Sequence, residues 1–469
     1  MKIKIGWLIF AFLILFGVII HGSEKPNLVV IMADQWRAQA FGFVGDPNAK
    51  TPNIDKLARE GIVMVNAISP VPVCCPARAT FMTGRRPLTH GVFVNDVMLS
   101  TNEITISEVL KKNGYDTAYI GKWHLDGHGR SNFIPKERRR GFDYWKALEC
   151  THNYSNSFYY ADTPQRLKWD GYDAFAQTED AIKYIKGRKD IQKPFFLMLS
   201  WGPPHDPYDM VPAEIKKLFD PAKFILRKNV PQEWMAKARE MLCGYYAHCY
   251  ALDKCVGDIV RTIDETGLKK NTILVFLSDH GDMLGSHGGH GKQRPFEESI
   301  RIPLIIRYPS LANSQGKKLD ALISMEDLMP TLLGLCSIDI PRTVEGLNYS
   351  AYIRGGKLPS DNVKLISCPA PFGLWSREQG GKEYRGIKTE RYTYVRDLNG
   401  PWLLFDNRND PFQTINLVNN PEYSKIQNKL DETLALKLKE AKDDFQPASY
   451  YIKKWGYIID ASGTVPYEP

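Results

Sequence analysis

Residues 27–35 read NLVVIMADQ, an apolar run without alternation that ends in Asp34 and Gln35. Continuous apolarity predicts a strand that is covered on both faces, as in a mainly parallel α/β sheet. Four further apolar, β-branched runs occur along the chain, at 117–120, 194–200, 272–277 and 302–307. Helical segments are expected between these runs, at 53–60, 106–113 and 233–266. The alternation predicts an α/β fold in which helices flank a large, mixed but mainly parallel sheet.

The chain changes character after about residue 355. Hairpin-like segments at 384–396 and 402–406 are followed by an amphipathic segment at 428–442, in which Leu430, Leu434 and Leu438 recur at helical spacing. We therefore predict an N-terminal domain over residues 23–358 and a smaller C-terminal α+β subdomain over residues 359–469, which carries an antiparallel sheet.

The N-terminus resembles a targeting segment. Lys2 and Lys4 precede an apolar stretch of 14 residues, 7–20, and small residues follow it. This pattern is typical of a secretory signal peptide, which we place at residues 1–22. A membrane span needs about 20 apolar residues, so the alternative, an uncleaved anchor, fits the length less well. We expect an exported protein, periplasmic or secreted, without a stable membrane span after signal cleavage.

Charge and cysteine content indicate which ligands and partners the protein is expected to have. The 469 residues carry a formal net charge of +8, a mild basic excess that is compatible with anionic ligands. The densest basic run, KERRR at 136–140, is expected to be a solvated face. We expect no nucleic-acid partner, because the chain has no recognisable module of that kind. The eight cysteines permit disulfides, but no CxxC pair occurs, which argues against a thiolate zinc site.

Polar residues follow four of the predicted strands. In open α/β sheets, ligands bind beyond the carboxyl ends of the strands, so these residues predict one composite site. They are Asp34 and Gln35, Lys122 and His124, His205, and Asp279 and His280. The oxygen-rich pairs Asp34-Gln35 and Asp279-His280 could hold a hard divalent cation, Ca²⁺ or Mg²⁺, although each pair alone would more often cap a turn.

The remaining polar residues are candidates for proton transfer and anion binding. His205, Lys122 and His124 lie in loops rich in Gly and Pro rather than on a packed face. Lys292 could reach the same site, whereas His287 and His290 are more readily explained as loop residues.

Two signatures identify a family. Cys74-Cys75-Pro76-Ala77-Arg78, followed by Thr83-Gly84-Arg85, is similar to the Cys-x-Pro-x-Arg signature of the type I, formylglycine-dependent sulfatases of the alkaline phosphatase superfamily. A second sulfatase signature matches residues 114–124. The other landmarks of the family occur in the expected order, and the resemblance covers residues 25 to about 417. It implies an alkaline phosphatase-like fold and a catalytic domain at 23–358.

The resemblance also implies a cofactor and a maturation partner. A formylglycine-generating enzyme would oxidise Cys74 to an aldehyde, guided by Pro76 and Arg78, while Cys75 is the variable position. The hydrated aldehyde offers two hydroxyls, one to attack sulfur and one whose deprotonation expels sulfate. One divalent metal ion, Ca²⁺ before Mg²⁺, would be bound by the modified residue at position 74 and by Asp34, Gln35, Asp279 and His280.

Five further residues receive roles through the same resemblance. Arg78 and Lys122 would hold the nucleophile in its ionised form, and Lys292 would grip a sulfate oxygen. His205 would protonate the departing alcohol, and His124 would assist the release of sulfate.

The metal-binding pairs depart from the commonest pattern of the family. Many sulfatases have Asp-Asp at the place of Asp34-Gln35 and Asp-Asn at the place of Asp279-His280. The pairing found here also occurs in relatives that hydrolyse phosphonate monoesters and phosphodiesters, with an Asp-Gln-Trp-Arg like that at 34–37. Two alternatives therefore stay open: such a hydrolase, or a non-catalytic polysaccharide-binding protein with an unmodified Cys74.

Sulfated carbohydrates are the expected substrates of an exported sulfatase. Trp375 and Arg377, the pair Tyr384-Arg385 and the loop 149–160 could stack on sugars and bind them, or their aromatic rings could fill the interface between the subdomains. We expect an exo-acting enzyme of glycan degradation that hydrolyses sulfate monoesters on a galactose-type sugar or a hexosamine.

Overall fold

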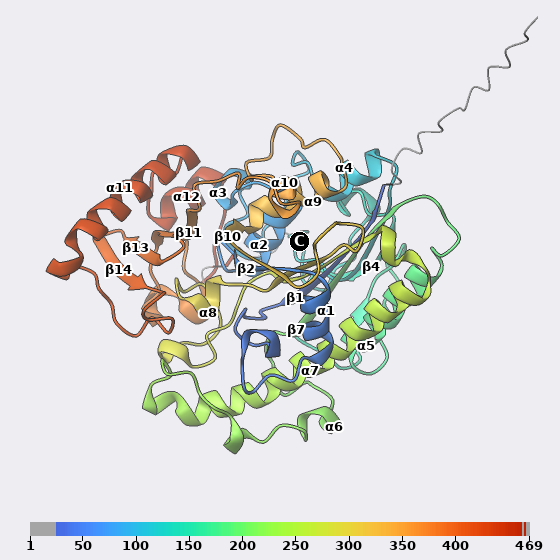
Figure 1. Cartoon of the computed structure of the whole chain (residues 1–469), viewed down its shortest axis with the longest axis horizontal. Coiled ribbons are helices and arrows are strands. Elements are labelled where there is room, and N and C mark those ends of the chain that lie inside the picture. Colours follow the sequence, from blue (N-terminus) through green and yellow to red (C-terminus); the bar gives the residue numbers. More distant parts are fainter. Residues whose placement is uncertain (1–24, 462–463, 466–469) are drawn as a thin grey trace, which may run out of the picture.

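The computed structural model describes residues 25–461 and 464–465, so the predicted signal peptide lies outside the described residues (Figure 1). Its main feature is an eight-stranded sheet in the order β10-β2-β9-β8-β1-β7-β3-β4. The strands are β1 (Asn27–Asp34), β2 (Ile62–Ile68), β3 (Asp116–Lys122), β4 (Tyr144–Leu148), β7 (Phe195–Pro204), β8 (Thr272–Ser278), β9 (Leu304–Arg307) and β10 (Lys317–Ser324). Only β9 runs antiparallel to its neighbours, which confirms the predicted mixed, mainly parallel sheet.

All five apolar runs are strands, but three other strands of this sheet were not predicted from the sequence. β4 and β10 form the two edges of the sheet, and polar residues interrupt their apolar pattern. Only Gly61 separates α1 (Pro52–Glu60) from β2, so the sequence has no loop that would mark where the strand begins. The run at 302–307 becomes a strand only at Leu304, since Pro303 has no N–H for a ladder.

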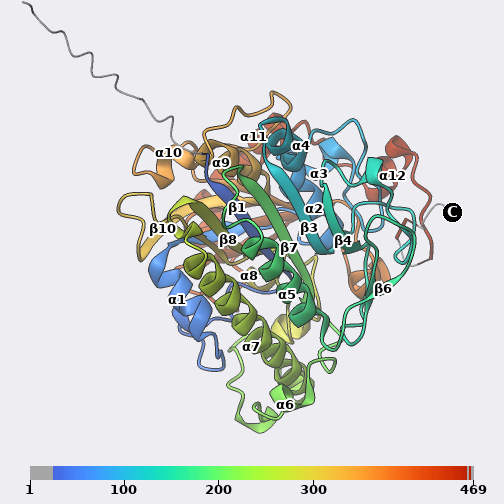
Figure 2. The ribbon, with the colours of Figure 1, turned by 90° about the vertical axis from the view of Figure 1, so that its right-hand side faces the viewer.

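Helices cover both faces of the sheet (Figure 2). α1, α5 (Asp173–Lys186) and α7 (Met235–Glu265) pack on one face. α2 (Cys74–Thr83), α4 (Ile106–Lys112) and α9 (Leu328–Leu335) pack on the other. Successive residues of β1 contribute alternately to the two cores, and this double burial is the reason for its continuous apolarity. The short helices are α3 (Pro87–His90), α6 (Ala213–Lys216), α8 (Glu297–Ile300) and α10 (Ser350–Ile353).

The C-terminal part contains the predicted antiparallel sheet. Its four strands are β11 (Lys364–Cys368), β12 (Tyr384–Lys388), β13 (Tyr392–Asp397) and β14 (Gly400–Asp406). The predicted amphipathic helix is α11 (Ser424–Ala441), whose Leu430 and Leu434 pack on Ile387 and Tyr394 of this sheet. The opposite face packs against Ile68 and Ile300, so the small sheet lies against the end of β2 and α8. α12 (Ala448–Trp455) and a ribbon of β5 (Phe158–Tyr159) and β6 (Leu167–Lys168) complete the fold. The boundary at 358/359 stays a prediction.

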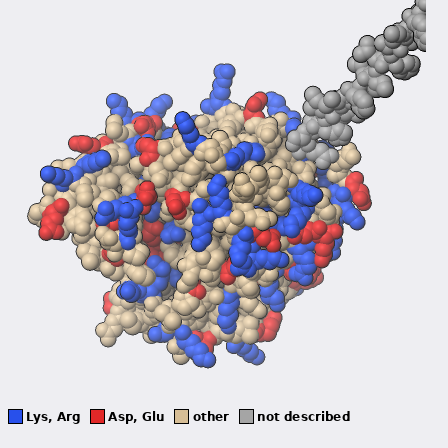
Figure 3. Space-filling model, in the orientation of Figure 1, with Lys and Arg blue, Asp and Glu red and all other residues tan. Residues whose placement is uncertain are grey.

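The basic run at 136–140 is only partly a solvated face. Arg139 and Arg140 are buried and pair with Asp162 and Glu108, so that part of the expectation was wrong. On the face shown in Figure 3, Lys and Arg side chains are spread widely, with Asp and Glu among them. All eight cysteines are buried and unpaired. Among the described residues, no helix combines the length and apolarity needed to cross a membrane.

Candidate active site

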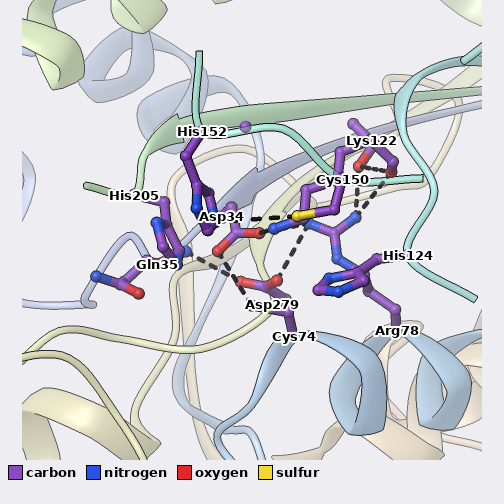
Figure 4. A network of polar contacts seen from close by, with 12 residues as sticks. Asp34, Gln35, Cys74, Arg78, Lys122, His124, Cys150, His152, His205 and Asp279 are labelled. Carbon is purple, nitrogen blue, oxygen red and sulfur yellow. Dashed lines mark hydrogen bonds and ion pairs between the residues drawn. The ribbon is translucent and has the colours of Figure 1, made fainter. Parts of the chain in front are cut away.

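The four polar clusters predicted at strand ends lie side by side. β8, β1, β7 and β3 are consecutive in the sheet, and they carry the clusters at their carboxyl ends. Asp34 ends β1 and Lys122 ends β3, His205 directly follows β7, and Asp279 and His280 directly follow β8. Parallel neighbours bring these ends to one edge, where the structure joins them to the start of α2 (Figure 4).

Cys74 is the first residue of α2, where the helix dipole is positive. Its Sγ atom lies 2.8 Å from Lys292 Nζ, 3.3 Å from His280 Nε2 and 3.6 Å from Asp34 Oδ1. Burial raises the pKa of the Cys74 thiol, but Lys122 and Lys292 outweigh it and hold that pKa well below its usual value. The surroundings of Cys74 therefore stabilise negative charge at this position.

Arg78 lies one turn further along α2 and connects the strand ends. Its Nη2 is 3.0 Å from Asp34 Oδ2 and 3.1 Å from Asp279 Oδ2. Its Nη1 donates to Ser200 Oγ at 2.6 Å and to the Lys122 carbonyl at 3.1 Å. Because Arg78 is 1% exposed, its charge would be costly without the two carboxylates. Ser200 was missed from the sequence, since it lies inside the apolar run of β7.

Asp34 receives a second cation. Lys122 Nζ lies 2.6 Å from Asp34 Oδ2, on the carboxylate oxygen that also faces Arg78. Burial raises the pKa of Asp34, but Lys122, His205 and Arg78 together hold it well below its usual range. Asp34 is therefore a carboxylate at neutral pH, and its other oxygen faces Cys74 and His280.

The donor atoms fit a divalent cation. Asp34, Cys74, Asp279 and His280 each offer one ligand atom, and these atoms lie within 4.8 Å of one another. His280 Nδ1 is 2.9 Å from the Gly281 carbonyl, which can only accept, so the neutral ring presents the Nε2 lone pair to the cluster. The carboxylate oxygens suit Ca²⁺ or Mg²⁺, whereas an imidazole is more usual on transition metals.

Gln35 completes this donor set. Its backbone N–H donates to Asp279 Oδ1 at 3.0 Å, and its Nε2 donates to Asp282 Oδ2 at 2.7 Å. The second hydrogen bond fixes the orientation of the amide, and Oε1 is left buried without a hydrogen-bond partner among the described residues. A cation would satisfy this orphaned acceptor. Gln35 adopts a left-handed backbone conformation with φ 69°.

Lys292 Nζ lies within hydrogen-bond distance of both Cys74 Sγ and His205 Nε2. Lys292 Nζ is 3.0 Å from His205 Nε2 and 3.3 Å from His280 Nε2. The Asp206 carbonyl accepts from His205 Nδ1 at 2.7 Å, so Nε2 is the ring nitrogen that faces Lys292. The ring of His152 stacks on His205 with centroids 4.8 Å apart. His152 was not singled out, because only the fold brings the loop 149–160 to β7.

His124 belongs to a neighbouring cluster around Cys75. His124 Nε2 lies 2.9 Å from Asp96 Oδ1, and the Asp96 backbone N–H donates to Cys75 Sγ at 3.2 Å. Arg130 Nη2 lies 2.8 Å from the other oxygen of Asp96. Asp96 was missed, because nothing in its local sequence indicates a histidine partner.

Two of the proposed sugar-contacting residues, Trp375 and Arg377, lie in the C-terminal part, whereas the loop 149–160 reaches His205 through His152. Trp375 is 3% exposed and packs near Tyr384 and Trp402, with centroids 6.1 and 6.5 Å away. Arg377 forms an ion pair with Glu383. Neither residue contacts the Cys74 cluster in the part of the chain that the structure describes, and their contact with sugars stays a prediction. His287 stacks on Phe296, with centroids 3.9 Å apart, and His290 Nε2 lies 3.5 Å from the Tyr208 hydroxyl.

Comparisons with known proteins agree with this arrangement. The sulfatase family model matches residues 26–338, and a model described as N-sulphoglucosamine sulphohydrolase, C-terminal, matches residues 285–440. An ulvan-active sulfatase from Formosa agariphila is 44% identical over 450 residues, 94% of this chain and 87% of that protein. An endo-4-O-sulfatase from Bacteroides thetaiotaomicron is 31% identical over 487 residues, 90% of this chain and 93% of that protein.

The solved structures lead to the same family. A crystal structure of the sulfatase yidJ from Bacteroides fragilis is 34% identical and superposes with a TM-score of 0.82, over 91% of this chain and 98% of that chain. A phosphonate monoester hydrolase from Agrobacterium radiobacter, 21% identical with a TM-score of 0.73, shares the fold. With its family match over residues 26–338 and its relatives among sugar sulfatases, the chain belongs to the sulfatase family of the alkaline phosphatase superfamily and is a sulfuric ester hydrolase.

Proposed function

We propose that this protein is an exported carbohydrate sulfatase that uses a formylglycine made from Cys74 and a bound Ca²⁺ ion. The observation that carries the proposal is the position of Cys74 Sγ, at the positive end of α2 and within 3.6 Å of Lys292, His280 and Asp34. The named activities of the relatives, on ulvan and at a sugar 4-O-sulfate, support a sugar as the carrier of the sulfate. Exo-action on a galactose-type sugar or a hexosamine is the finer part of the proposal.

The sulfur of Cys74 marks the place of the formylglycine oxygens. The hydrated formylglycine would supply a geminal hydroxyl as the nucleophile. The metal ion, when bound, would supply a Lewis acid that polarises the sulfate. Arg78 and Lys122 keep Asp34 ionised and in place, and Gln35 orients its Oε1 through its hydrogen bond to Asp282. These residues set the site before substrate arrives, so little reorganisation is needed during the reaction.

Lys292 and His205 are placed to act on the ester. The Lys292 ammonium group, 2.8 Å from Cys74 Sγ, would bind a sulfate oxygen and stabilise the charge that develops there. His205 Nε2, next to Lys292, would hold the proton that is given to the departing sugar oxygen as the S–O bond breaks, so that the sugar leaves as an alcohol. Its Nδ1–H stays on the Asp206 carbonyl and fixes the ring. His124, on the Cys75 side, would assist the release of sulfate.

The first test is the mass of the tryptic peptide that spans residues 60–78, from protein made in a host with a formylglycine-generating system. We expect an aldehyde at Cys74 and a thiol at Cys75. An unmodified Cys74 under these conditions would contradict the proposal. Turnover of sulfated monosaccharides should then exceed turnover of the matching phosphonate monoesters, and the opposite preference would support the phosphonate hydrolase alternative.

The metal can be tested separately from activity. Chelation should abolish turnover and lower the melting temperature, because it removes a cation that binds only the folded state. Ca²⁺ should restore both quantities better than Mg²⁺. Asp279→Asn should weaken the thermal shift caused by Ca²⁺, whereas Asp361→Asn, at a half-exposed surface ion pair, should leave it unchanged. A Ca²⁺ shift of equal size in both variants would argue against Asp279 as a ligand.

Export is the remaining part of the proposal. Its support is the charged and apolar pattern of residues 1–22. Cell fractionation, with sequencing of the mature N-terminus, should find the protein outside the cytoplasm and starting near residue 23. A protein that keeps residues 1–22 and pellets with the membrane would favour the uncleaved anchor.

A further inference from the structure

A pocket lined in part by the loop after β1 shares no residue with the Cys74 cluster. Its volume is about 450 Å³, within the range of small-ligand sites. The loop after β1, the segment before α7, α8 and the turn at 411–412 form its walls. Its charged lining residues are Arg37, Asp46, Arg227, Lys228, Glu297 and Arg301. Cations outnumber acids here, so the pocket favours an anion.

Arg37 is the central residue of this pocket. It is 2% exposed, and two of its guanidinium nitrogens, Nε and Nη1, have no hydrogen-bond partner among the described residues. Its Nη2 donates to the Tyr246 hydroxyl at 3.4 Å, and Tyr246 in turn donates to Asp46. Asp46 reaches this guanidinium only through Tyr246, so an anion in the pocket could accept from the two N–H groups that are still unpaired.

The acidic lining residues are already engaged. Glu297 forms an ion pair with Lys388, and Asp46 accepts from Tyr246. By contrast, Lys228 is exposed and lies 5.7 Å from the ring centroid of Phe412, over which Arg227 also lies at 4.8 Å. Arg227 and Arg301 are paired with Glu298 and Glu297, so the rim combines the Phe412 ring with one exposed cation, Lys228, that has no ion pair among the described residues.

Gln39 adds an unsatisfied acceptor. Its Nε2 donates to the Glu297 carbonyl at 3.1 Å, which fixes the amide, and its Oε1 is buried without a partner in the part of the chain that the structure describes. The pocket thus lacks an anionic acceptor for Arg37 and a hydroxyl donor for Gln39. Inorganic sulfate supplies only the first, whereas a sugar that carries a carboxylate or a sulfate supplies both.

We propose that this pocket is a second binding site, which takes an anionic sugar unit through Arg37, Gln39 and the cationic rim. The apolar lining of Pro47, Ile225, Leu226 and Phe412 suits the C–H face of a sugar ring. The identification of a sugar rests in part on the proposed function. The preference for an anion with a hydroxyl group rests instead on the unpaired groups of Arg37 and Gln39. The site would bind a remote unit of an anionic glycan or the same chemistry in a free sugar acid.

Binding measurements on the full-length protein test the proposal. The probes are sodium glucuronate, inorganic sulfate and methyl glucoside, which supply both groups, the anion alone and the hydroxyls alone. Calorimetry should find glucuronate bound more tightly than sulfate, and no binding of methyl glucoside. Arg37→Gln should weaken glucuronate by at least about tenfold, since a charge-assisted hydrogen bond is lost. Gln39→Ala and Lys228→Gln should weaken it several-fold.

Arg261→Gln is the matched control, because Arg261 is an exposed cation paired with Asp258. Equal affinity for glucuronate in this control and in the pocket variants would overturn the proposal. If Arg37→Gln does not fold, Lys228→Gln at the exposed rim still decides the question. Sulfate that binds as tightly as glucuronate, and is lost in Lys228→Gln, would overturn the sugar part of the proposal.

Kinetics separate this inference from the proposed function. Lys228→Gln should leave kcat/KM for a small aryl sulfate unchanged and raise KM for an anionic sulfated oligosaccharide several-fold if a remote unit is bound. An unchanged KM together with weakened glucuronate binding would identify the ligand as a free sugar acid. Failure of the wild-type protein to hydrolyse any sugar sulfate would contradict the proposed function, but it would leave the glucuronate measurement intact.

Discussion

Cys74 and Cys75 are neighbours in the chain, but their electrostatic surroundings are opposite. Cys74 Sγ faces Lys292 and His280, and nearby cations hold the pKa of its thiol well below the usual value. Cys75 Sγ turns into the core and accepts from the Asp96 N–H, and burial raises the pKa of its thiol. One residue of helical rotation thus separates a sulfur placed for chemistry from a sulfur placed for packing.

The cluster around Cys74 contains many charges because its buried carboxylates need cationic partners. Asp34 and Asp279 would be costly to bury alone, and Arg78 joins them to one cation. Around Cys75, Asp96 is the carboxylate that pairs with His124 and Arg130. The cluster around Cys74 is a preorganised electrostatic site, whereas the cluster around Cys75 is a smaller ion-paired network next to it.

The largest expected effect comes from substitution of the two cysteines. Cys74→Ala should lower kcat for an aryl sulfate by at least about 10³-fold, because it removes the nucleophile. Cys75→Ala should keep kcat within about threefold of wild type and lower the free energy of unfolding by about 1 kcal/mol, the cost of a small cavity. Initial rates and urea unfolding measure the two effects. Similar kcat losses in the two variants would refute the separation.

The next effect concerns the leaving group. His205→Ala should lower kcat/KM for a sugar sulfate by about 10²- to 10³-fold, since the departing alkoxide needs a proton. For an activated aryl sulfate the loss should be about tenfold or less, because that leaving group needs little protonation. His152→Ala is the control, since His152 stacks on His205 without contacting Lys292, and both substrates should lose only a few-fold. Equal losses on both substrates in His205→Ala would exclude its role as the acid.

Much of the fold and of the Cys74 cluster could be predicted, because strand and site lie next to each other in the sequence. Asp34 and Asp279 directly end or follow apolar runs whose double burial is visible in composition. Asp96 and His152 could not be found in this way, since they lie in loops that only the tertiary fold brings to the site. Trp375 shows the converse, because an aromatic residue in a predicted binding loop proves to be buried against Tyr384.

The smallest expected effect concerns the ion pair of Asp96 and His124 beside Cys75. Burial raises the pKa of Asp96, but His124 and Arg130 outweigh it and lower that pKa well below its ordinary value of 3.8. The carboxylate therefore stabilises the fold above pH 3.8, and this stabilisation is lost as the pH falls towards the folded-state pKa. His124 has a pKa well above its ordinary value of 6.5, so its contribution is complete below pH 6.5 and is lost as the pH rises through the folded-state pKa.

Asp96→Asn should therefore lower the free energy of unfolding by about 2 kcal/mol at pH 6, where both partners are charged. The difference from wild type should shrink at pH 3, because the wild-type carboxylate is losing its advantage there. Urea unfolding at the two pH values measures this, with Asp361→Asn as the control at an exposed pair. A deficit of the same size at both pH values would show that Asn disturbs the packing around Cys75 rather than an ion pair, and the contrast between the two cysteines would then rest on burial alone.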